Sequence, residues 1–477
     1  MEGKVRVITF SFFLLVVCLS GGSAKPLEYQ NLVLGTLPRP ATHNNDLSWS
    51  ESSTLSELEN AETSIETTLS VRLEHRDVLA FNATPEALFE LRLERDVARV
   101  ETLTTMAAGS RNATRVPPKD FSSSIISGLS QGSGEYFTRL GIGTPPRYLY
   151  MVLDTGSDIV WIQCAPCRKC YNQADPVFDP KKSGSFAAVP CSSPLCRRLD
   201  ASGCSQQRLC LYQVSYGDGS FTIGEFSTEV LTFRGTKVGN VAFGCGHDNE
   251  GLFVGAAGLF GLGRGGLSFP SQTGRRFGRK FSYCLVDRQS SKPSSAVFGE
   301  SSVPRSAVFT PMLTNPKLDT FYYIELTGIS VGGVLVPGIS ASMFRLDAAG
   351  NGGVIIDSGT SVTRLTRPAY IALRDAFRAG AQLKSAPGFS LFDTCYDLSG
   401  KSVVKVPTVV MHFGGGANLA LPAANYLIPV DSNATFCFAF AGTSGGLSIV
   451  GNIQQQGFRV VFDGAGSRIG FSPNGCA

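Results

Sequence analysis

Histidine is scarce in this chain of 477 residues, which contains only four. His247 and His412 are the two that lie beyond residue 134, and neither accompanies a G-x-S-x-G turn or a second metal ligand at helical or hairpin spacing. A serine hydrolase with a histidine base and a histidine-bound metal centre are therefore both excluded. We expect no metal ion and no cofactor.

Long apolar runs are missing after the N-terminus. Lys4 and Arg6 precede an apolar stretch over 8–19 and small residues ending at Ala24, which is the pattern of a secretory signal peptide cleaved after residue 24. No later segment reaches the roughly 20 apolar residues that a membrane span requires. The last residues show neither a retention signal nor a lipid-anchor tail. We expect an exported protein without a membrane span.

A continuous basic run and an aromatic platform are also absent, so nucleic acid is not an expected partner. Charge is instead divided between segments. Residues 25–120 carry ten Lys/Arg and fifteen Asp/Glu, whereas the chain beyond residue 120 is net +8. Because an acidic leader and a basic body attract each other, we interpret 25–125 as a removable pro-segment; an inert linker is the alternative.

The leader also contains a helix signal. Thr84 supplies a hydroxyl cap and Pro85 stands in the first turn, a combination typical of a helix start. Leu88, Leu91 and a charged run through Arg99 continue the pattern as an amphipathic helix. We therefore expect the leader to fold against another part of the chain.

Cysteine is used unevenly. Removal of the signal peptide leaves twelve of the thirteen cysteines, an even number typical of disulfides in an exported protein. Seven lie between Cys164 and Cys210, which predicts a stapled, loop-rich insertion. The spacing Cys164-x-x-Cys167-x-x-Cys170 also fits zinc or redox chemistry, but export and the even count favour disulfides. The sequence leaves their pairing open.

Short β-prone segments separated by glycine dominate from about residue 134 onward, as the 53 glycines suggest. The clearest helix in this part begins near Thr366, with Pro368 in its first turn and Tyr370, Leu373 and Phe377 on one side. The body is therefore predicted to be mostly β.

An apolar run that ends in aspartate, a hydroxyl residue and glycine occurs twice, at 154–157 and at 357–360. Each copy is followed about a hundred residues later by an apolar-apolar-glycine sequence, ending at Gly261 and at Gly451. The repeated order predicts two related lobes that join near 305–320. A buried strand ending in a glycine turn holds one carboxyl group rigidly, and two such groups can share a water molecule. This indicates hydrolytic chemistry.

The first of these glycines also begins a G-x-G-x-x-G pattern at 261–266, with Asp287 about 20 residues further on. The flanking sequence does not indicate the strand, turn and helix that a dinucleotide site requires. Gly261 is instead the counterpart of Gly451 in the repeat, so we interpret it as a place where two chain segments cross beneath an Asp turn.

Over about 134–477 these motifs resemble the pepsin-like aspartic peptidases. Trp161 follows the first Asp motif at the family's usual offset, and 214–219 looks like the flap hairpin with its tyrosine. The cysteine-rich insertion, together with leader elements around His75 and Arg95, resembles the nepenthesin-like, atypical plant branch. The resemblance implies an all-β, bilobal pepsin-like fold with the cleft between two related β lobes.

The same resemblance implies that Asp154 and Asp357 are the catalytic pair. Aspartic proteases are the well-known example of two carboxyl groups that share one proton. One carboxylate would act as general base on a bridging water while its protonated partner hydrogen-bonds the scissile carbonyl. Tyr216, Gly217 and Asp218 would lie in a flap that closes over an extended peptide.

Further roles are implied by the family pattern. Hydroxyl-to-backbone bonds from Thr155 and Ser358 would cross-link the two turns, Ser157 and Thr360 would hydrogen-bond the carboxyl groups, and Trp161 would donate toward Tyr216. The supporting residues are Thr155, Gly156, Ser157, Ser358, Gly359 and Thr360. Family analogy also implies the disulfides Cys395–Cys437 within the second lobe and Cys284–Cys476 across the lobes.

The predicted organisation is a signal peptide over 1–24, a pro-segment over 25–125, an N-terminal lobe with the cysteine-rich insertion over 126–310 and a C-terminal lobe over 311–477. Asn82, Asn112 and Asn433 are in Asn-x-Thr sequons, and only Asn433 would remain on the mature protein as a glycosylation site.

The sequence thus predicts a secreted, monomeric aspartic endopeptidase made as a zymogen. Its partners would be an extended peptide or protein substrate and its own pro-segment, and its location the apoplast or cell wall if the source is a plant. The alternative is a catalytically inactive pepsin-like binding protein resembling xylanase inhibitors. Retention of both aspartates and of the flap tyrosine argues against that alternative.

Overall fold

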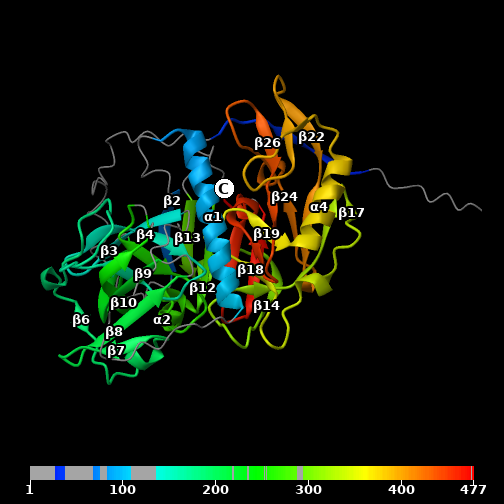
Figure 1. Cartoon of the computed structure of the whole chain (residues 1–477). Coiled ribbons are helices and arrows are strands. Elements are labelled where there is room, and N and C mark those ends of the chain that lie inside the picture. Colours follow the sequence, from blue (N-terminus) through cyan, green and yellow to red (C-terminus); the bar gives the residue numbers. More distant parts are fainter. Residues whose placement is uncertain are drawn as a thin grey trace, which may run out of the picture.

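The computed structural model describes residues 27–37, 68–75, 83–108, 136–216, 220–233, 236–251, 253, 255–286, 294–473 and 475–476. Two bodies of β-strands lie on either side of one long helix (Figure 1). The all-β, bilobal prediction is confirmed. The signal peptide, Gly217 and Asp218 of the flap, Asp287 and the sequons at Asn82 and Asn112 lie outside the described residues.

The leader contributes three elements: β1 (Tyr29–Val33), β2 (Thr68–His75) and α1 (Pro85–Ala107). The predicted helix start is confirmed, because the Thr84 hydroxyl accepts a hydrogen bond from the Ala87 N–H at 3.2 Å. Leu88 is buried, but Leu91 is 42% exposed. The buried face of α1 is therefore turned away from Leu91 and includes charged residues.

The N-terminal lobe is built from the elements β3 (Tyr136–Ile142), β4 (Arg147–Asp154), β5 (Trp161–Gln163), β6 (Ala187–Ala188), β7 (Ser202–Cys204), β8 (Cys210–Ser215), β9 (Phe221–Phe233), β10 (Thr236–Glu250), β11 (Gly258–Gly261), α2 (Phe269–Gln272), α3 (Gly274–Phe277), β12 (Lys280–Cys284) and β13 (Ser294–Gly299). Its longest pairing joins β9 to β10 in antiparallel register.

The C-terminal lobe is built from the elements β14 (Val308–Leu313), β15 (Tyr323–Ile324), β16 (Leu326–Val331), β17 (Val334–Leu335), β18 (Val354–Ile356), β19 (Thr363–Thr366), α4 (Arg367–Gly380), β20 (Ser385–Ala386), β21 (Cys395–Asp397), β22 (Val403–Pro407), β23 (Val409–Phe413), β24 (Asn418–Leu421), β25 (Leu427–Pro429), β26 (Thr435–Phe438), β27 (Phe440–Thr443), β28 (Ser448–Val450), α5 (Asn452–Gln455), β29 (Arg459–Asp463) and β30 (Arg468–Ser472). As predicted, α4 buries Tyr370, Leu373 and Phe377 on one side.

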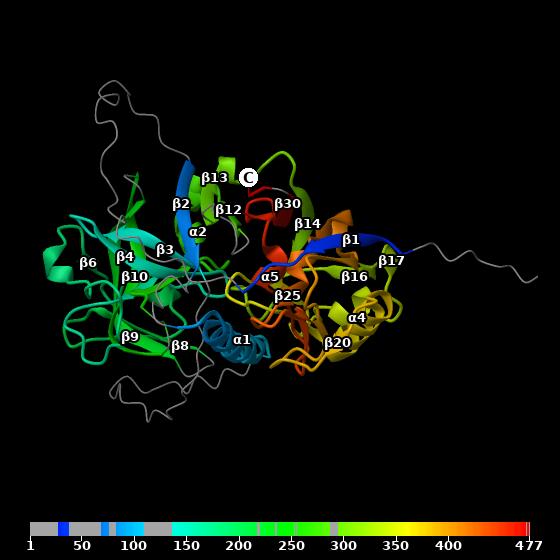
Figure 2. The same cartoon turned by 90° about the horizontal axis from the view of Figure 1, so that it is seen from above.

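One sheet connects the lobes and includes a strand of the leader. Successive antiparallel pairings run from β3 through β2, β13, β12, β29 and β30 to β14. In Figure 2, β2, β13, β12, β30 and β14 are seen in the upper part of the picture, with α1 below them. The other leader strand, β1, pairs with β22 at the far side of the C-terminal lobe. The leader therefore contacts both lobes through backbone hydrogen bonds.

Twelve cysteines form six disulfides: Cys164–Cys245, Cys167–Cys170, Cys191–Cys204, Cys196–Cys210, Cys284–Cys476 and Cys395–Cys437. The last two are the pairs that family analogy implied. Cys164, Cys167 and Cys170 are all in disulfides, so this cluster does not form the zinc site that its spacing also allowed. Within the described residues, no helix is long and apolar enough to cross a membrane.

Candidate active site

The two aspartates lie at the ends of two buried strands, in the space between the lobes. Asp154 is the last residue of β4, and Asp357 directly follows β18. A parallel neighbour supports each strand, because β11 pairs with β4 and β28 pairs with β18. Both carboxyl-bearing residues are almost completely buried, at 2% exposure for Asp154 and 0% for Asp357.

The glycines of the repeat lie where chain segments cross. A Cβ atom on Gly261 would come within 2.5 Å of the Asp158 backbone, and one on Gly451 within 2.6 Å of the Ser361 carbonyl oxygen. Neither position accepts a side chain without a shift of the backbone. The same geometry in both lobes agrees with the interpretation of these glycines as crossing points rather than part of a dinucleotide site.

The two Asp turns are bonded to each other across the lobe boundary. The Ser358 N–H donates to the Thr155 hydroxyl at 2.9 Å, and the Thr155 N–H donates to the Ser358 hydroxyl at 3.4 Å. The Thr155 hydroxyl also lies 3.1 Å from Oδ1 of Asp357. This reciprocal pair, expected from the family pattern, fixes the relative position of the two carboxyl groups.

The hydroxyl groups that follow the two turns differ in their bonding. Thr360 donates to Oδ2 of Asp357 at 2.6 Å. The Ser157 hydroxyl is buried and has no hydrogen-bond partner among the described residues, so the expected bond to Asp154 is not present. Asp154 instead accepts from the Gly156 N–H at 3.0 Å. The two carboxyl groups therefore have unequal surroundings.

Tyr216 stands at the edge of the described part of the flap. Its hydroxyl accepts a hydrogen bond from Nε1 of Trp161 at 2.8 Å, as the family pattern implied. Trp161 is fully buried in β5 and packs edge-on against Phe253 at a centroid distance of 4.9 Å. This contact connects the base of the flap to the lobe core.

Arg99 of α1 occupies the space between the two aspartates. Its Nη2 atom lies 2.5 Å from Oδ1 of Asp154 and 2.8 Å from Oδ1 of Asp357, and its Nε donates to Oδ2 of Asp357 at 2.7 Å. One guanidinium group therefore bridges both lobes. The sequence predicts a helix that extends to Arg99, but it indicates no partner for this side chain.

The glycines of the two Asp turns make room for Arg99. A Cβ atom on Gly156 would lie 2.6 Å from Nη2 of Arg99, and one on Gly359 would lie even closer to the guanidinium carbon. Any side chain at either position would collide with the guanidinium group, so both turns need glycine to accept Arg99.

Electrostatics favours an ionised Asp357 beside a charged Arg99. Burial raises the pKa of Asp357, but the ion pair and hydrogen bonds with Arg99 outweigh burial and hold that pKa below its ordinary value. Burial lowers the pKa of Arg99, but the negative charges of Asp154 and Asp357 raise it by more. The pKa of Arg99 therefore lies above its ordinary value. The guanidinium group therefore remains charged at every relevant pH.

Asp158 forms another link between the lobes. Its carboxyl group accepts hydrogen bonds from the Thr320 hydroxyl at 2.7 Å and from the Gly265 N–H at 2.8 Å. Burial raises the pKa of Asp158 to about 6, and the charges of Asp319 and Asp200 add to the increase, while the two hydrogen bonds oppose it. This group changes its charge close to the weakly acidic range.

The raised pKa of Asp158 predicts a pH dependence of stability. Because the folded protein binds this proton more tightly than the unfolded chain, the contribution is complete below about pH 4 and is lost as the pH rises through about 6. Asp158→Asn should therefore flatten the decrease in unfolding temperature between pH 4 and 7. Thermal melts of both proteins at several pH values test this, and parallel curves would contradict it.

Sequence comparisons identify relatives that cover most or all of this chain. The family model described as "Xylanase inhibitor N-terminal" matches residues 136–300, and the one described as "Xylanase inhibitor C-terminal" matches residues 321–473. "Aspartyl protease family protein 2" of Arabidopsis thaliana is 64% identical over 100% of both chains. "Aspartic proteinase nepenthesin-1" of Nepenthes gracilis is 41% identical over 85% of this chain and 90% of the relative.

Solved structures show the same fold at lower similarity. The crystal structure of edgp matches with a TM-score of 0.60 and 21% identity, over 72% of this chain and 92% of that chain. Basic 7S globulin from soybean matches with a TM-score of 0.56 and 20% identity, over 71% and 92% of the two chains. At these identities the likeness concerns the fold alone.

Two β lobes whose cross-linked Asp turns present one pair of carboxyl groups define the pepsin-like class of aspartic peptidases. Within that class, the chain belongs to the plant aspartyl protease family, in the branch that includes nepenthesin-like relatives.

Proposed function

We propose that this chain is the zymogen of a secreted aspartic endopeptidase with Asp154 and Asp357 as its catalytic pair. The observation that carries the proposal is the convergence of both carboxyl groups on one guanidinium group, that of Arg99. One guanidinium group can bind both carboxyl groups only if the two groups, which come from different lobes, face the same small space. A shared water would occupy that space once α1 has left.

The expected mechanism follows from the two carboxyl groups. Without Arg99, two carboxyl groups this close do not both ionise readily, so the pair retains one proton over an acidic range. The ionised member would remove a proton from the bridging water, and the protonated member would hydrogen-bond the scissile carbonyl. Return of a proton to the amine would then release the two peptides, with no covalent acyl-enzyme.

Latency of the precursor would come from α1. The helix fills the cleft with a cation that neutralises both catalytic groups, and the same ion pairs prevent either group from accepting a proton from water. Because Arg99 lowers the pKa of Asp357, the contribution of this ion pair to leader docking is present above the ordinary carboxyl pKa of about 4 and is lost as the pH falls through the lowered pKa. Acid would therefore loosen the leader.

The proposed endopeptidase would also have a flap and a glycan. Tyr216, with Gly217 and Asp218, would close over an extended peptide or protein substrate. Asn433 is exposed in the turn between β25 and β26 and would carry the glycan. We propose that the mature enzyme is a monomer of the apoplast or cell wall, and that the leader over 25–125 is removed after the signal peptide.

A non-catalytic binding protein remains the second candidate, because two matching family models are described as parts of xylanase inhibitors. The retained pair of aspartates, the hydroxyl-glycine sequences after them and the bond from Trp161 to Tyr216 favour the enzyme. An inhibitor would have no need for a leader cation that neutralises two carboxyl groups.

The test is cleavage of a denatured protein between about pH 3 and 7, before and after acid treatment, with and without pepstatin. We expect acid-optimal cleavage that follows removal of the leader and that pepstatin stops. If the acid-treated chain, with its leader removed, cleaves nothing and washes through a pepstatin resin, the binding-protein candidate is correct.

A further inference from the structure

A second carboxylate of α1 is bound close to the aspartate pair, and the catalytic mechanism does not use it. Oδ1 of Asp96 accepts hydrogen bonds from the backbone N–H groups of Ser361 and Val362, and the Val362 bond is 3.1 Å long. Oδ2 of Asp96 accepts from Nη2 of Arg364 at 2.5 Å. Three donors of the C-terminal lobe thus converge on one carboxyl group.

These donors are in or next to a strand of the C-terminal lobe that is paired on both sides. Ser361 follows Asp357 by four residues, and Arg364 lies in β19, which pairs with both β27 and β28. Arg364 is only 4% exposed and Asp96 only 2% exposed. A guanidinium group and two backbone N–H groups that are held in place form a strong, charge-assisted binding site for a carboxylate.

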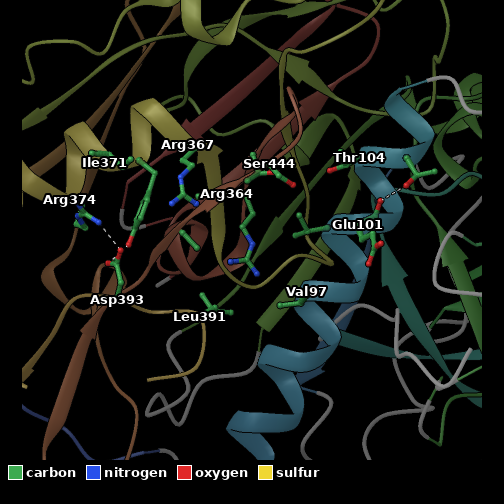
Figure 3. Close-up of a pocket in the computed structure, with 16 residues that line it drawn as sticks. Val97, Glu101, Thr104, Arg364, Arg367, Ile371, Arg374, Leu391, Asp393 and Ser444 are labelled. Atoms are coloured by element: carbon green, nitrogen blue, oxygen red, sulfur yellow. Dashed lines mark hydrogen bonds and ion pairs between the residues drawn. The ribbon is translucent and has the colours of Figure 1, made fainter. Parts of the chain in front are cut away.

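Departure of α1 would remove the carboxylate but not its donors. The buried Arg364 would then line the cleft without the Asp96 partner. Because a buried charge without its ion-pair partner is energetically costly, binding of another anion at this place would be favourable. A cavity of about 530 Å³ adjoins this place. Arg364, Arg367 and Arg374 lie on one side of it, and Val97, Glu101 and Thr104 of α1 lie on the other (Figure 3).

We propose that Ser361, Val362 and Arg364 form a carboxylate-binding subsite that selects peptide substrates with an anionic group near the scissile bond. The inference rests on the proposed function and adds a substrate class to it. In the precursor, Asp96 occupies the subsite in the way that a substrate carboxylate occupies it in the mature enzyme.

The distance from the catalytic pair limits where the anionic group lies in the substrate. Asp96 precedes Arg99 by three residues, which corresponds to about 4.5 Å along a helix axis. An extended peptide advances about 3.3 Å per residue. The selected carboxylate therefore belongs to a residue within about three positions of the scissile bond.

The direct experiment compares matched peptides in which each of these positions carries Glu or Gln. The mature enzyme, prepared by acid activation of the full chain, should cleave the Glu peptide at one position with a kcat/KM about 10-fold higher. Arg364→Gln should reduce this ratio to about 1, and Arg364→Lys should leave an intermediate ratio. Arg378→Gln, which removes an exposed arginine of α4, is the control and should keep the ratio.

A pH series on the wild type supplies a readout that does not depend on any variant. Glutamate has an ordinary pKa of about 4.3, so the preference for Glu over Gln should be present at pH 5.5 and vanish at pH 3. Peptides that end within three residues of the cleaved bond, as free acid or as amide, show whether a terminal carboxylate is selected in place of a side chain.

The outcomes separate this inference from the proposed function. Equal cleavage of all Glu and Gln peptides, and of free-acid and amide ends, would overturn the subsite while leaving the peptidase established. A preference that survives Arg364→Gln or persists at pH 3 would overturn it as well. Failure to cleave any peptide would remove the proposed function and the subsite with it.

Discussion

Asp154→Asn and Asp357→Asn are each expected to lower kcat of the leader-free enzyme by about 10³-fold or more. An amide has nearly the shape of the carboxyl group but cannot take a proton from water or hold the proton that the pair shares. The loss should be similar for the two variants, since the chemistry belongs to the pair rather than to either member. Initial rates on a quenched peptide near pH 4 measure it.

The control for this prediction must separate chemistry from folding. Asp200→Asn, which changes an exposed aspartate of the N-terminal lobe, should leave the rate unchanged. Because the variants could fail to process themselves, the leader is removed in every case by an added protease at a site engineered after Ala108. Normal thermal unfolding with lost cleavage supports the mechanism, whereas an active Asp357→Asn enzyme would exclude it.

The meeting of the two Asp turns could be predicted from the sequence because the motif occurs twice. Each Asp turn follows an apolar strand, and each has a glycine about a hundred residues later where the chain crosses beneath it. A repeat of this kind constrains the fold strongly, since both copies must satisfy the same packing. The helix signals at Thr84 and Thr366 were equally local, because a proline in the first turn acts within that turn, and at Thr84 a side-chain cap adds to it.

The docking of the leader could not be predicted in the same way. The partners of Arg99 are 55 and 258 residues away along the chain, and no local pattern specifies such pairs. Strands β1 and β2 were also missed, because their hydrogen bonds are completed by β22, β13 and β3 rather than by neighbours in sequence. Edge pairing depends on which sheet edges the rest of the fold leaves open.

One signal in the leader pointed toward the site. Arg92, Arg95, Asp96 and Arg99 follow the i, i+3, i+4, i+7 spacing of one helix face, and all four are buried. Buried charges of this number are rare unless they are paired. A charged stripe on the face that also carries Leu88 therefore indicates a helix that binds charged groups of the body, although the sequence does not identify them.

Replacement of Arg99 should have the largest effect on the precursor. Arg99→Gln removes the cation from a place where two buried carboxyl groups face it, and breaking a buried ion pair from one side costs about 3–5 kcal/mol. This corresponds to a shift of about 10²–10⁴-fold toward the undocked helix, at about 1.4 kcal/mol per tenfold. We expect the uncut Arg99→Gln chain to bind pepstatin resin at pH 6, where uncut wild type should not bind.

The pH profile of pepstatin binding separates loss of the cation from general damage to the helix. Uncut wild type should begin to bind only when acid protonates Asp357, whose pKa Arg99 lowers. Arg99→Lys, which keeps the charge but lacks the planar fork, should begin to bind at a higher pH than wild type. Glu94→Gln removes an exposed charge from the same helix and should behave as wild type. If Arg99→Gln remained unable to bind at pH 6, the bulk of α1 and the strand β2 would be sufficient to close the cleft, and the ion pairs would serve stability rather than latency.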